Sequence, residues 1–196
     1  MVKPTLLLLL VSVLLYISST ATSAAAPAAA SNFIKASCRT TTYPALCIQS
    51  LSAYATSIQQ NPLQLTQTAL SVSLENAQST RTFVYKLTKF KGVKPREMAA
   101  LKDCLEEIDD TADRLSKSYN ELKNLGHYKG KDFQWHMSNV ETWVSAALTD
   151  ENTCTDGFAG KALNGKMKSS IKARIVKVAQ VTSNALSLIN KYASKH

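Results

Sequence analysis

Four cysteines are the residues in this 196-residue chain whose chemistry is easiest to define: Cys38, Cys47, Cys104 and Cys154. Thiols at fixed positions either pair as disulfides or bind a metal ion. A zinc site usually contains closely spaced ligands such as a C-x-x-C pair, and no such pair occurs. The chain has three histidines, and none stands at ligand spacing from a cysteine. The even count therefore predicts two disulfides and no metal site.

Carboxylates are the second group that could do chemistry, because five of them crowd into one short segment: Glu106, Glu107, Asp109, Asp110 and Asp113. Such clusters can act as acid–base pairs or bind calcium. This one lies inside a helical apolar pattern and lacks the glycine and alternating ligands of a calcium loop. The neighbouring Leu105, Ile108 and Ala112 occupy the apolar face, so the acids are expected to face solvent. No catalytic or phosphate-binding motif occurs elsewhere, and we expect no catalytic residue and no cofactor.

Aromatic side chains form the third group, with four within sixteen residues: Tyr128, Phe133, Trp135 and Trp143. Trp143 neighbours Val140 and Ala147 on one helical face, which favours packing. Trp135 lies off the apolar spacing and is predicted to be exposed beside Lys131 and Asp132. Exposed aromatic rings among charges are typical of protein-binding surfaces. For His136, a place at a surface or interface is favoured over a role as a ligand.

The N-terminal residues predict a secretory signal peptide over residues 1–25. Lys3 is the only charge before Lys35, and it precedes an apolar run over residues 6–17, followed by small residues. Twelve residues are too few for a membrane-spanning helix, which needs about 20. The chain is therefore predicted to be secreted, with no membrane partner.

The elements that must position these groups are helices, since glycine is scarce and apolar residues recur at helical spacing. Four amphipathic helices are predicted, at about 62–90, 95–124, 132–148 or slightly beyond, and 166–192. In the second, the apolar residues repeat with spacings of 3 and 4 over more than three heptads. Asp132 is expected to cap the third helix. The interruptions between the segments favour an all-α, up-down-up-down four-helix bundle over residues 61–196, rather than a coiled-coil filament.

Residues 26–60 are predicted to form an N-terminal helical hairpin around a turn at residues 41–44. Cys38 and Cys47 flank this turn and would close it as a local disulfide. Cys104 lies 20 residues before the end of the second bundle helix, and Cys154 lies 22 residues after the start of the third. In two antiparallel neighbouring helices these positions lie at nearly the same level along the bundle axis. The difference of two residues corresponds to about 3 Å. The favoured pairs are therefore Cys38–Cys47 and Cys104–Cys154.

Charge is distributed unevenly along the chain, whose formal net charge is +9. The segment 97–121 holds eight of the fourteen acids, whereas no acid follows Asp156. The ordinary interpretation is a set of solvated helix faces. The sharper hypothesis is that the basic last helix meets a polyanion or an acidic protein surface. Nucleic acid is not expected as a partner, because the chain lacks a nucleic-acid-binding motif.

Four motifs, taken together, make the chain resemble the plant invertase/pectin methylesterase inhibitor family over its whole mature length. The first is Cys38-x-Thr40-x-x-Tyr43-Pro44-x-x-Cys47, and the second runs from Ala100-Leu101-x-Asp103-Cys104 to Asp109-Asp110. The third reads Val140-Glu141-Thr142-Trp143-Val144-Ser145-Ala146-Ala147-Leu148-Thr149. The fourth is Thr153-Cys154-x-Asp156-Gly157-Phe158. The resemblance implies a two-disulfide helical bundle that covers the active-site cleft of a cell-wall enzyme.

The third motif is similar to the pectin methylesterase inhibitor branch. Invertase inhibitors carry Pro-Lys-Phe before this helix, where the chain has Lys131-Asp132-Phe133. Pectin methylesterase in the apoplast is thus the expected partner, and acid invertase is the alternative. A wall protein that binds anionic pectin through its basic last helix is a further alternative. The predicted contact residues come from outward positions of the second and third bundle helices and the connection between them: Glu106, Asp110, Lys131, Asp132, Phe133 and Trp135.

Overall fold

The computed structural model describes residues 28–158 and 165–196, so the predicted signal peptide over residues 1–25 lies outside the described residues. Within the described ranges the secondary structure is entirely helical. No helix in this part of the chain combines the length and the apolar character needed to cross a bilayer.

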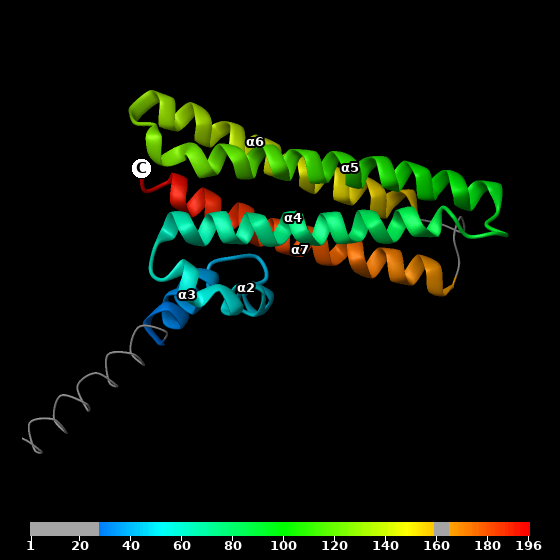
Figure 1. The fold of residues 1–196 in the computed structure, drawn as a ribbon, viewed down its shortest axis with the longest axis horizontal. Coiled ribbons are helices and arrows are strands. Elements are labelled where there is room, and N and C mark those ends of the chain that lie inside the picture. The colour runs from blue at the N-terminus through cyan, green and yellow to red at the C-terminus, as the bar shows by residue number, and fades with distance from the viewer. Residues whose placement is uncertain (1–27, 159–164) are drawn as a thin grey trace, which may run out of the picture.

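Four long helices run along the same axis and make the bundle (Figure 1): α4 (Pro62–Leu87), α5 (Pro95–Asn124), α6 (Gly130–Gly157) and α7 (Lys166–Ala193). Each helix packs against two others, with α4 on α5 and α7, and α6 on α5 and α7. Helices that follow one another in the chain are therefore neighbours in space, and α7 closes the ring against α4. This is the predicted up-down-up-down four-helix bundle.

Local signals at the helix ends explain most of these boundaries. Asn61 caps α4, since its side-chain oxygen accepts hydrogen bonds from the backbone N–H of Leu63 (2.9 Å) and Gln64 (3.1 Å). Gly92, in the turn to α5, has φ +86°, a conformation that glycine adopts without strain. The Lys94 backbone N–H donates to the Glu97 carboxylate (3.1 Å) at the start of α5.

The third bundle helix differs from its predicted bounds at both ends. It begins at Gly130 and ends at Gly157, whereas the sequence predicted Asp132 to Leu148 or slightly beyond. Asp132 lies in the first turn and is not the capping residue. A carboxylate in a first turn still interacts favourably with the positive end of the helix dipole.

The N-terminal hairpin consists of helical residues 28–38, a turn, and α2 (Pro44–Leu51), followed by the short turns η1 (Ser52–Tyr54) and α3 (Ala55–Ile58). It lies against one half of the face made by α4 and α7 (Figure 1). Its buried Ile34, Leu51 and Ile58 contact Leu65 of α4 and Leu188 of α7. The hairpin therefore has no separate core and depends on the bundle.

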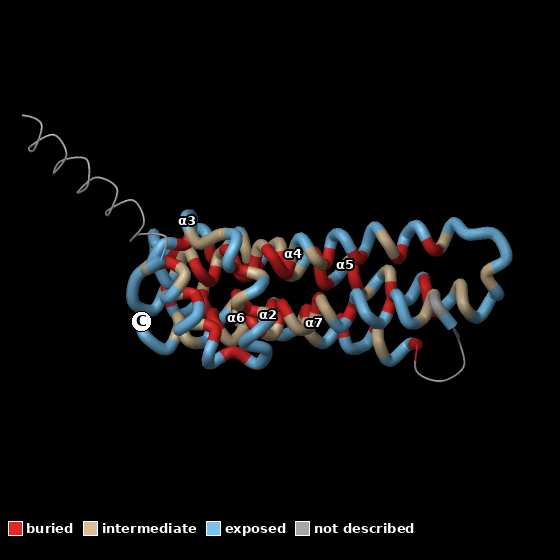
Figure 2. Tube along the Cα trace, turned by 90° about the horizontal axis from the view of Figure 1, so that it is seen from below, coloured by how far each residue is buried: buried red, intermediate tan, exposed pale blue. Residues whose placement is uncertain are grey.

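Buried residues follow the inner side of every bundle helix, and exposed residues follow the outer side (Figure 2). One core cluster includes Leu115, Leu122, Met137 and Val140 at the end where α5 turns into α6. A second cluster surrounds Cys104 of α5 and Cys154 of α6, nearer the opposite end of the bundle, and includes Leu101 and Ile108. Continuous packing along the bundle makes each outer face a firm surface.

Candidate partner-binding surface

Two disulfides fix the elements that carry the candidate surface. Cys38 pairs with Cys47, and Cys104 of α5 pairs with Cys154 of α6, as the sequence predicted. No free cysteine is found among the described residues. The second bridge joins the two helices that carry the predicted contact residues, so these helices cannot slide along each other.

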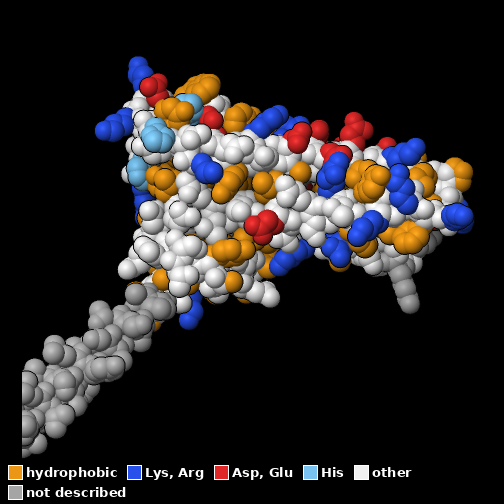
Figure 3. All heavy atoms as spheres, viewed as in Figure 1, with side chains coloured by type: hydrophobic (Ala, Val, Ile, Leu, Met, Phe, Trp, Pro, Cys, Tyr) orange, Lys and Arg blue, Asp and Glu red, His pale blue; other side chains and the backbone are white. Residues whose placement is uncertain are grey.

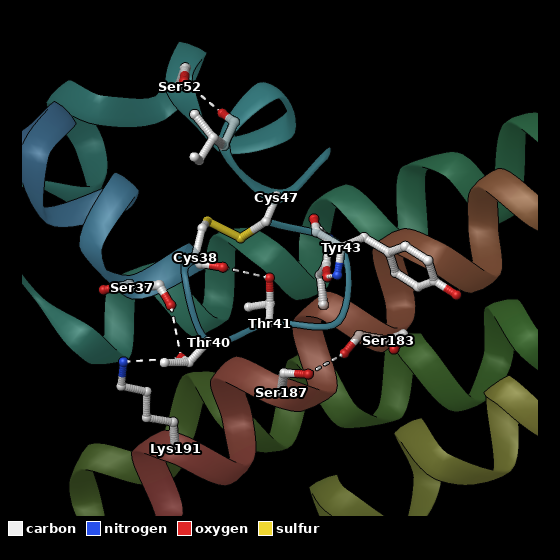
Figure 4. The surroundings of a disulfide bond; sticks show 12 residues. Ser37, Cys38, Thr40, Thr41, Tyr43, Cys47, Ser52, Ser183, Ser187 and Lys191 are labelled. Atoms are coloured by element: carbon white, nitrogen blue, oxygen red, sulfur yellow. Dashed lines mark hydrogen bonds between the residues drawn. A yellow bond between two sulfur atoms is a disulfide. The ribbon is translucent and has the colours of Figure 1, made fainter. Parts of the chain in front are cut away.

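Figure 4 shows how the first disulfide and its turn attach to α7. The Tyr43 backbone N–H donates to the Asn184 side-chain oxygen (2.8 Å), and the Asn184 amide donates to the Tyr43 carbonyl (3.0 Å). The Thr41 hydroxyl donates to the carbonyl of Cys38 (2.8 Å) within the turn. Asn184 thus replaces two hydrogen bonds that an unattached turn would make with water.

Trp135 is the most exposed large apolar side chain in the described part of the chain, with 62% of its surface accessible. It projects from the first turns of α6, next to Lys131 and Asp132, which are also exposed. Its ring meets the His136 ring edge-on (4.7 Å between centroids). An exposed tryptophan on a rigid helix is a typical energetic centre of a protein interface.

His136 is held from two sides at the same end of the bundle. Its ring stacks on Tyr128 (3.5 Å between centroids), and its Nδ1 lies 2.5 Å from a carboxylate oxygen of Glu121 on α5. The Asn139 amide donates to the same oxygen (3.4 Å). Sequence reasoning placed His136 at a surface or interface but missed Glu121 and Tyr128 as its partners. Glu121 lies fifteen residues earlier, and only the antiparallel turn between α5 and α6 brings the two together.

Phe133 differs from its neighbours because only 8% of its surface is exposed. Its ring contacts Tyr192 and His196 near the C-terminal end of α7. In this conformation the ring supports the start of α6 and is not offered to a partner. Its spacing of four from buried Met137 already places it on the inner face of the helix.

The acids of α5 lie farther along the bundle. Glu106 and Asp110 are exposed, whereas Asp109 forms an ion pair with Arg81 of α4. Between Asp110 and Glu121, which reaches the Trp135 end, the helix rises by about 17 Å. The exposed predicted contact residues therefore form two groups on the α5–α6 side, one acidic and one around Trp135, and Phe133 lies inside the bundle.

Arg114 connects the acidic group to α6. Its Nε lies 2.7 Å from a carboxylate oxygen of Asp150. Its Nη2 lies 3.8 Å from a carboxylate oxygen of Asp110. Burial raises the pKa of Asp150, and the Arg114 charge opposes that rise. Burial and the neighbouring Asp150 charge also raise the pKa of Glu107. Among the described residues, no set of three side chains that could hold a metal ion occurs.

Glu151 is a buried carboxyl group that sequence reasoning missed. Its side chain is 0% exposed, and one oxygen accepts a hydrogen bond from the Thr182 hydroxyl of α7 (2.9 Å). The other oxygen has no hydrogen-bond partner among the described residues. Burial raises the pKa of this carboxyl to about 8. The residue follows Ala147 by four and precedes Cys154 by three, a spacing that places it on the inner face.

Comparisons with known proteins agree with this architecture. A family model described as plant invertase/pectin methylesterase inhibitor matches residues 32–188. A 21 kDa protein of Daucus carota is 62% identical over 167 residues, covering 85% of this chain and 86% of that protein. Pectinesterase inhibitor 11 of Arabidopsis thaliana is 54% identical over 168 residues, covering 85% of this chain and 83% of that protein.

A solved structure supports the fold independently. The crystal structure of a mutant form of a pectin methylesterase inhibitor from Arabidopsis matches with a TM-score of 0.63 at 23% identity, covering 78% of this chain and 92% of that one. The family model and the curated relatives each span most of the sequence. The chain therefore belongs to the plant invertase/pectin methylesterase inhibitor family.

Proposed function

We propose that the chain is a secreted protein inhibitor of pectin methylesterase, which acts in the cell wall by covering the active-site cleft of the enzyme. The observation that carries this proposal is 54% identity, across most of both chains, to a pectinesterase inhibitor of Arabidopsis thaliana. Inhibition of this kind needs a firm surface and no reaction on the inhibitor. The α5–α6 side of the bundle supports this proposal, because a disulfide joins its two helices.

Trp135 is proposed as the centre of the contact, with Lys131 and Asp132 beside it. All three side chains are exposed, and the helix that carries them is joined to α5 by a disulfide. Preorganised contact residues lose little conformational entropy on binding. Glu106 and Asp110 would extend the contact along α5, and Phe133 would hold the start of α6 in place.

An acid invertase is the alternative target. The connection before α6 argues against it, because Lys131-Asp132-Phe133 stands where invertase inhibitors carry Pro-Lys-Phe. An acid at the middle position would reverse the charge offered to the enzyme. Pectin methylesterase is therefore the preferred target. Titrating an acid invertase with the purified protein, beside a pectin methylesterase, separates the two.

The test is a titration of a plant pectin methylesterase with the purified mature protein, at acidic and at neutral pH. Enzyme activity is expected to fall as the inhibitor approaches a one-to-one ratio. No loss of activity at any ratio or pH would refute the proposal.

Replacing Trp135 by alanine is expected to weaken inhibition by about 30-fold or more, since a central interface tryptophan contributes about 2 kcal/mol or more. The matched control is Phe90→Ala, which removes another exposed aromatic ring (57% accessible) in the turn between α4 and α5. This variant is expected to inhibit normally. Equal inhibition constants for both variants would place the contact elsewhere on the bundle.

A further inference from the structure

The face formed by α4 and α7 is covered by the N-terminal hairpin on one half only. On the other half the two helices border an open groove of about 410 Å³. Its polar lining comes from both helices: Asn76, Ser79, Thr80, Ser170, Arg174 and Lys177. The groove lies on the helix pair opposite α5 and α6, so a ligand there would leave the Trp135 surface free.

The residues that line the groove include two cations, Arg174 and Lys177, and no acid. The guanidinium of Arg174 lies over the Phe83 ring, 4.2 Å from its centroid, which orients the side chain without a carboxylate. None of the ion pairs found between described residues involves Arg174 or Lys177. Lys86 follows Ser79 by two helical turns and so adds a third cation to the same side of α4.

Acidic residues are almost absent from the two helices that border the groove. The described α7 contains none. The only acid of α4 is Glu75, which lies four residues before Ser79 on the same side of the helix and accepts a hydrogen bond from Ser71 (3.2 Å), so three cations face one carboxylate. Lysine and arginine side chains also gather at the end of the bundle where α4 turns into α5 (Figure 3). A polyanion would therefore approach along a positive potential.

We propose that this groove binds a carboxylated polysaccharide, namely de-esterified pectin. The cations of Arg174 and Lys177 suit the repeated carboxylates of such a polymer, and the serine and threonine hydroxyls and the Asn76 amide suit its sugar hydroxyls. A neutral polymer would leave Arg174 and Lys177 unpaired. The choice of pectin rests on the proposed function, because pectin methylesterase produces those carboxylates. Binding the product would concentrate the inhibitor where the enzyme has acted.

The test measures retention of the full secreted protein on immobilised polygalacturonate, on fully methyl-esterified pectin and on dextran sulfate, at about 0.15 M salt. The protein is expected to bind polygalacturonate and to pass through the esterified polymer. Replacing both Arg174 and Lys177 by glutamine is expected to weaken polygalacturonate binding by about tenfold or more. Circular dichroism should show unchanged helix content.

The matched control is Arg96→Gln with Lys172→Gln, which removes one arginine and one lysine at exposed positions outside the groove. This variant is expected to stay within about twofold of the original affinity. Equal losses in the two variants, or no loss in either, would overturn the groove as the site. Equal binding to the esterified polymer, or stronger binding to dextran sulfate, would overturn the assignment of the ligand.

Enzyme inhibition provides a separate readout. The Arg174 and Lys177 variant should inhibit pectin methylesterase normally, because the groove is not part of the proposed inhibitory surface. Binding to polygalacturonate without any inhibition by the original protein would refute the proposed function and leave the groove assigned. Inhibition of the enzyme without binding to polygalacturonate would refute the groove as a pectin site and leave the proposed function standing.

Discussion

Removing the disulfide between Cys104 and Cys154 is expected to destabilise the protein more than removing the one between Cys38 and Cys47. The bridges close loops with sequence separations of 50 and 9. In the chain-entropy model these loops correspond to about 4 and about 2.6 kcal/mol of stabilisation. The larger loop also contains the whole turn between α5 and α6, so its bridge restricts the unfolded chain over a longer segment.

Packing adds to this difference. Both sulfurs of the Cys104–Cys154 bridge are buried in a core cluster with Val84, Leu101 and Ile175, which come from three helices. Replacing both cysteines by alanine removes these sulfurs and leaves unfilled volume in the core. The Cys38–Cys47 bridge is also buried, but its cluster joins the hairpin to the bundle and is not the centre of the bundle.

The measurement is denaturant unfolding of the two double-alanine variants and the original protein at one pH. The free energy of unfolding should fall by about 4 kcal/mol or more for Cys104→Ala with Cys154→Ala, and by clearly less for the hairpin pair. Each variant serves as the control for the other, because both lose two sulfurs. A larger loss from the hairpin pair would show that the hairpin, and not the α5–α6 pair, limits stability.

Much of the bundle could be predicted because its seams are long and regular. The second bundle helix keeps its 3 and 4 spacing without interruption, and its predicted bounds, 95–124, are those of α5. The same regularity made the heights of Cys104 and Cys154 comparable from the amino-acid sequence alone. Spacing within a helix predicts which residues face inward, and short connections predict which helices are neighbours.

The third bundle helix shows where this reasoning fails. Its inner positions continue from Ala147 through Glu151 and Cys154 to Phe158 with spacings of 4, 3 and 4. The two acids at 150 and 151 interrupt the apolar pattern, and the predicted helix therefore ended too early. Their partners, Arg114 on α5 and Thr182 on α7, are more than thirty residues away in sequence. Such pairs depend on how whole helices meet, which spacing within one helix does not reveal.

The candidate surface was predictable in part for the same reason. The position of Trp135 off the apolar spacing predicted its exposure, and the ring is exposed. Phe133 was predicted as a contact because it lies in the connection before the third helix, although its own spacing places it inside. The groove between α4 and α7 could not be predicted, because its residues come from helices that are far apart in the sequence. In the sequence, only the excess of basic residues in the last helix indicated a positively charged site.

Raising the pH from about 4.5 to about 8 is expected to destabilise the protein by up to roughly 4–5 kcal/mol, because Glu151 ionises freely in the unfolded chain but keeps its proton inside the folded core. Its pKa in the folded protein is about 8, against an ordinary value of 4.5. Between these values the folded state holds a proton that the unfolded state has released. Stability therefore falls as pH rises through this window, and it is highest below the unfolded pKa.

Neighbouring groups act in the same direction but less strongly. The pKa values of Asp150 and Glu107 are also raised by burial, and these residues lie on the facing sides of α6 and α5. Thr182 opposes the rise at Glu151, since its hydroxyl donates to the carboxylate. The single hydrogen bond does not replace the water lost by both oxygens, so burial has the larger effect.

Replacing Glu151 by glutamine isolates this contribution. The amide keeps the size of the side chain and an oxygen that can accept the Thr182 hydrogen bond, but it does not titrate. The variant should lose most of the pH dependence between about 5 and about 8 and should be more stable than the original protein at pH 8. The control is Glu106→Gln, an exposed position on α5, which should keep the original dependence.

Denaturant unfolding of the three proteins at about pH 5, 6, 7 and 8 measures these differences. A stability that is flat or rises toward the upper end of this range in the original protein, or an unchanged slope in the Glu151→Gln variant, would contradict the assignment. Glu151 joins α6 to α7 close to the bridge that joins α6 to α5. The protein is therefore expected to be most stable at acidic pH, near and below the ordinary pKa of this carboxyl.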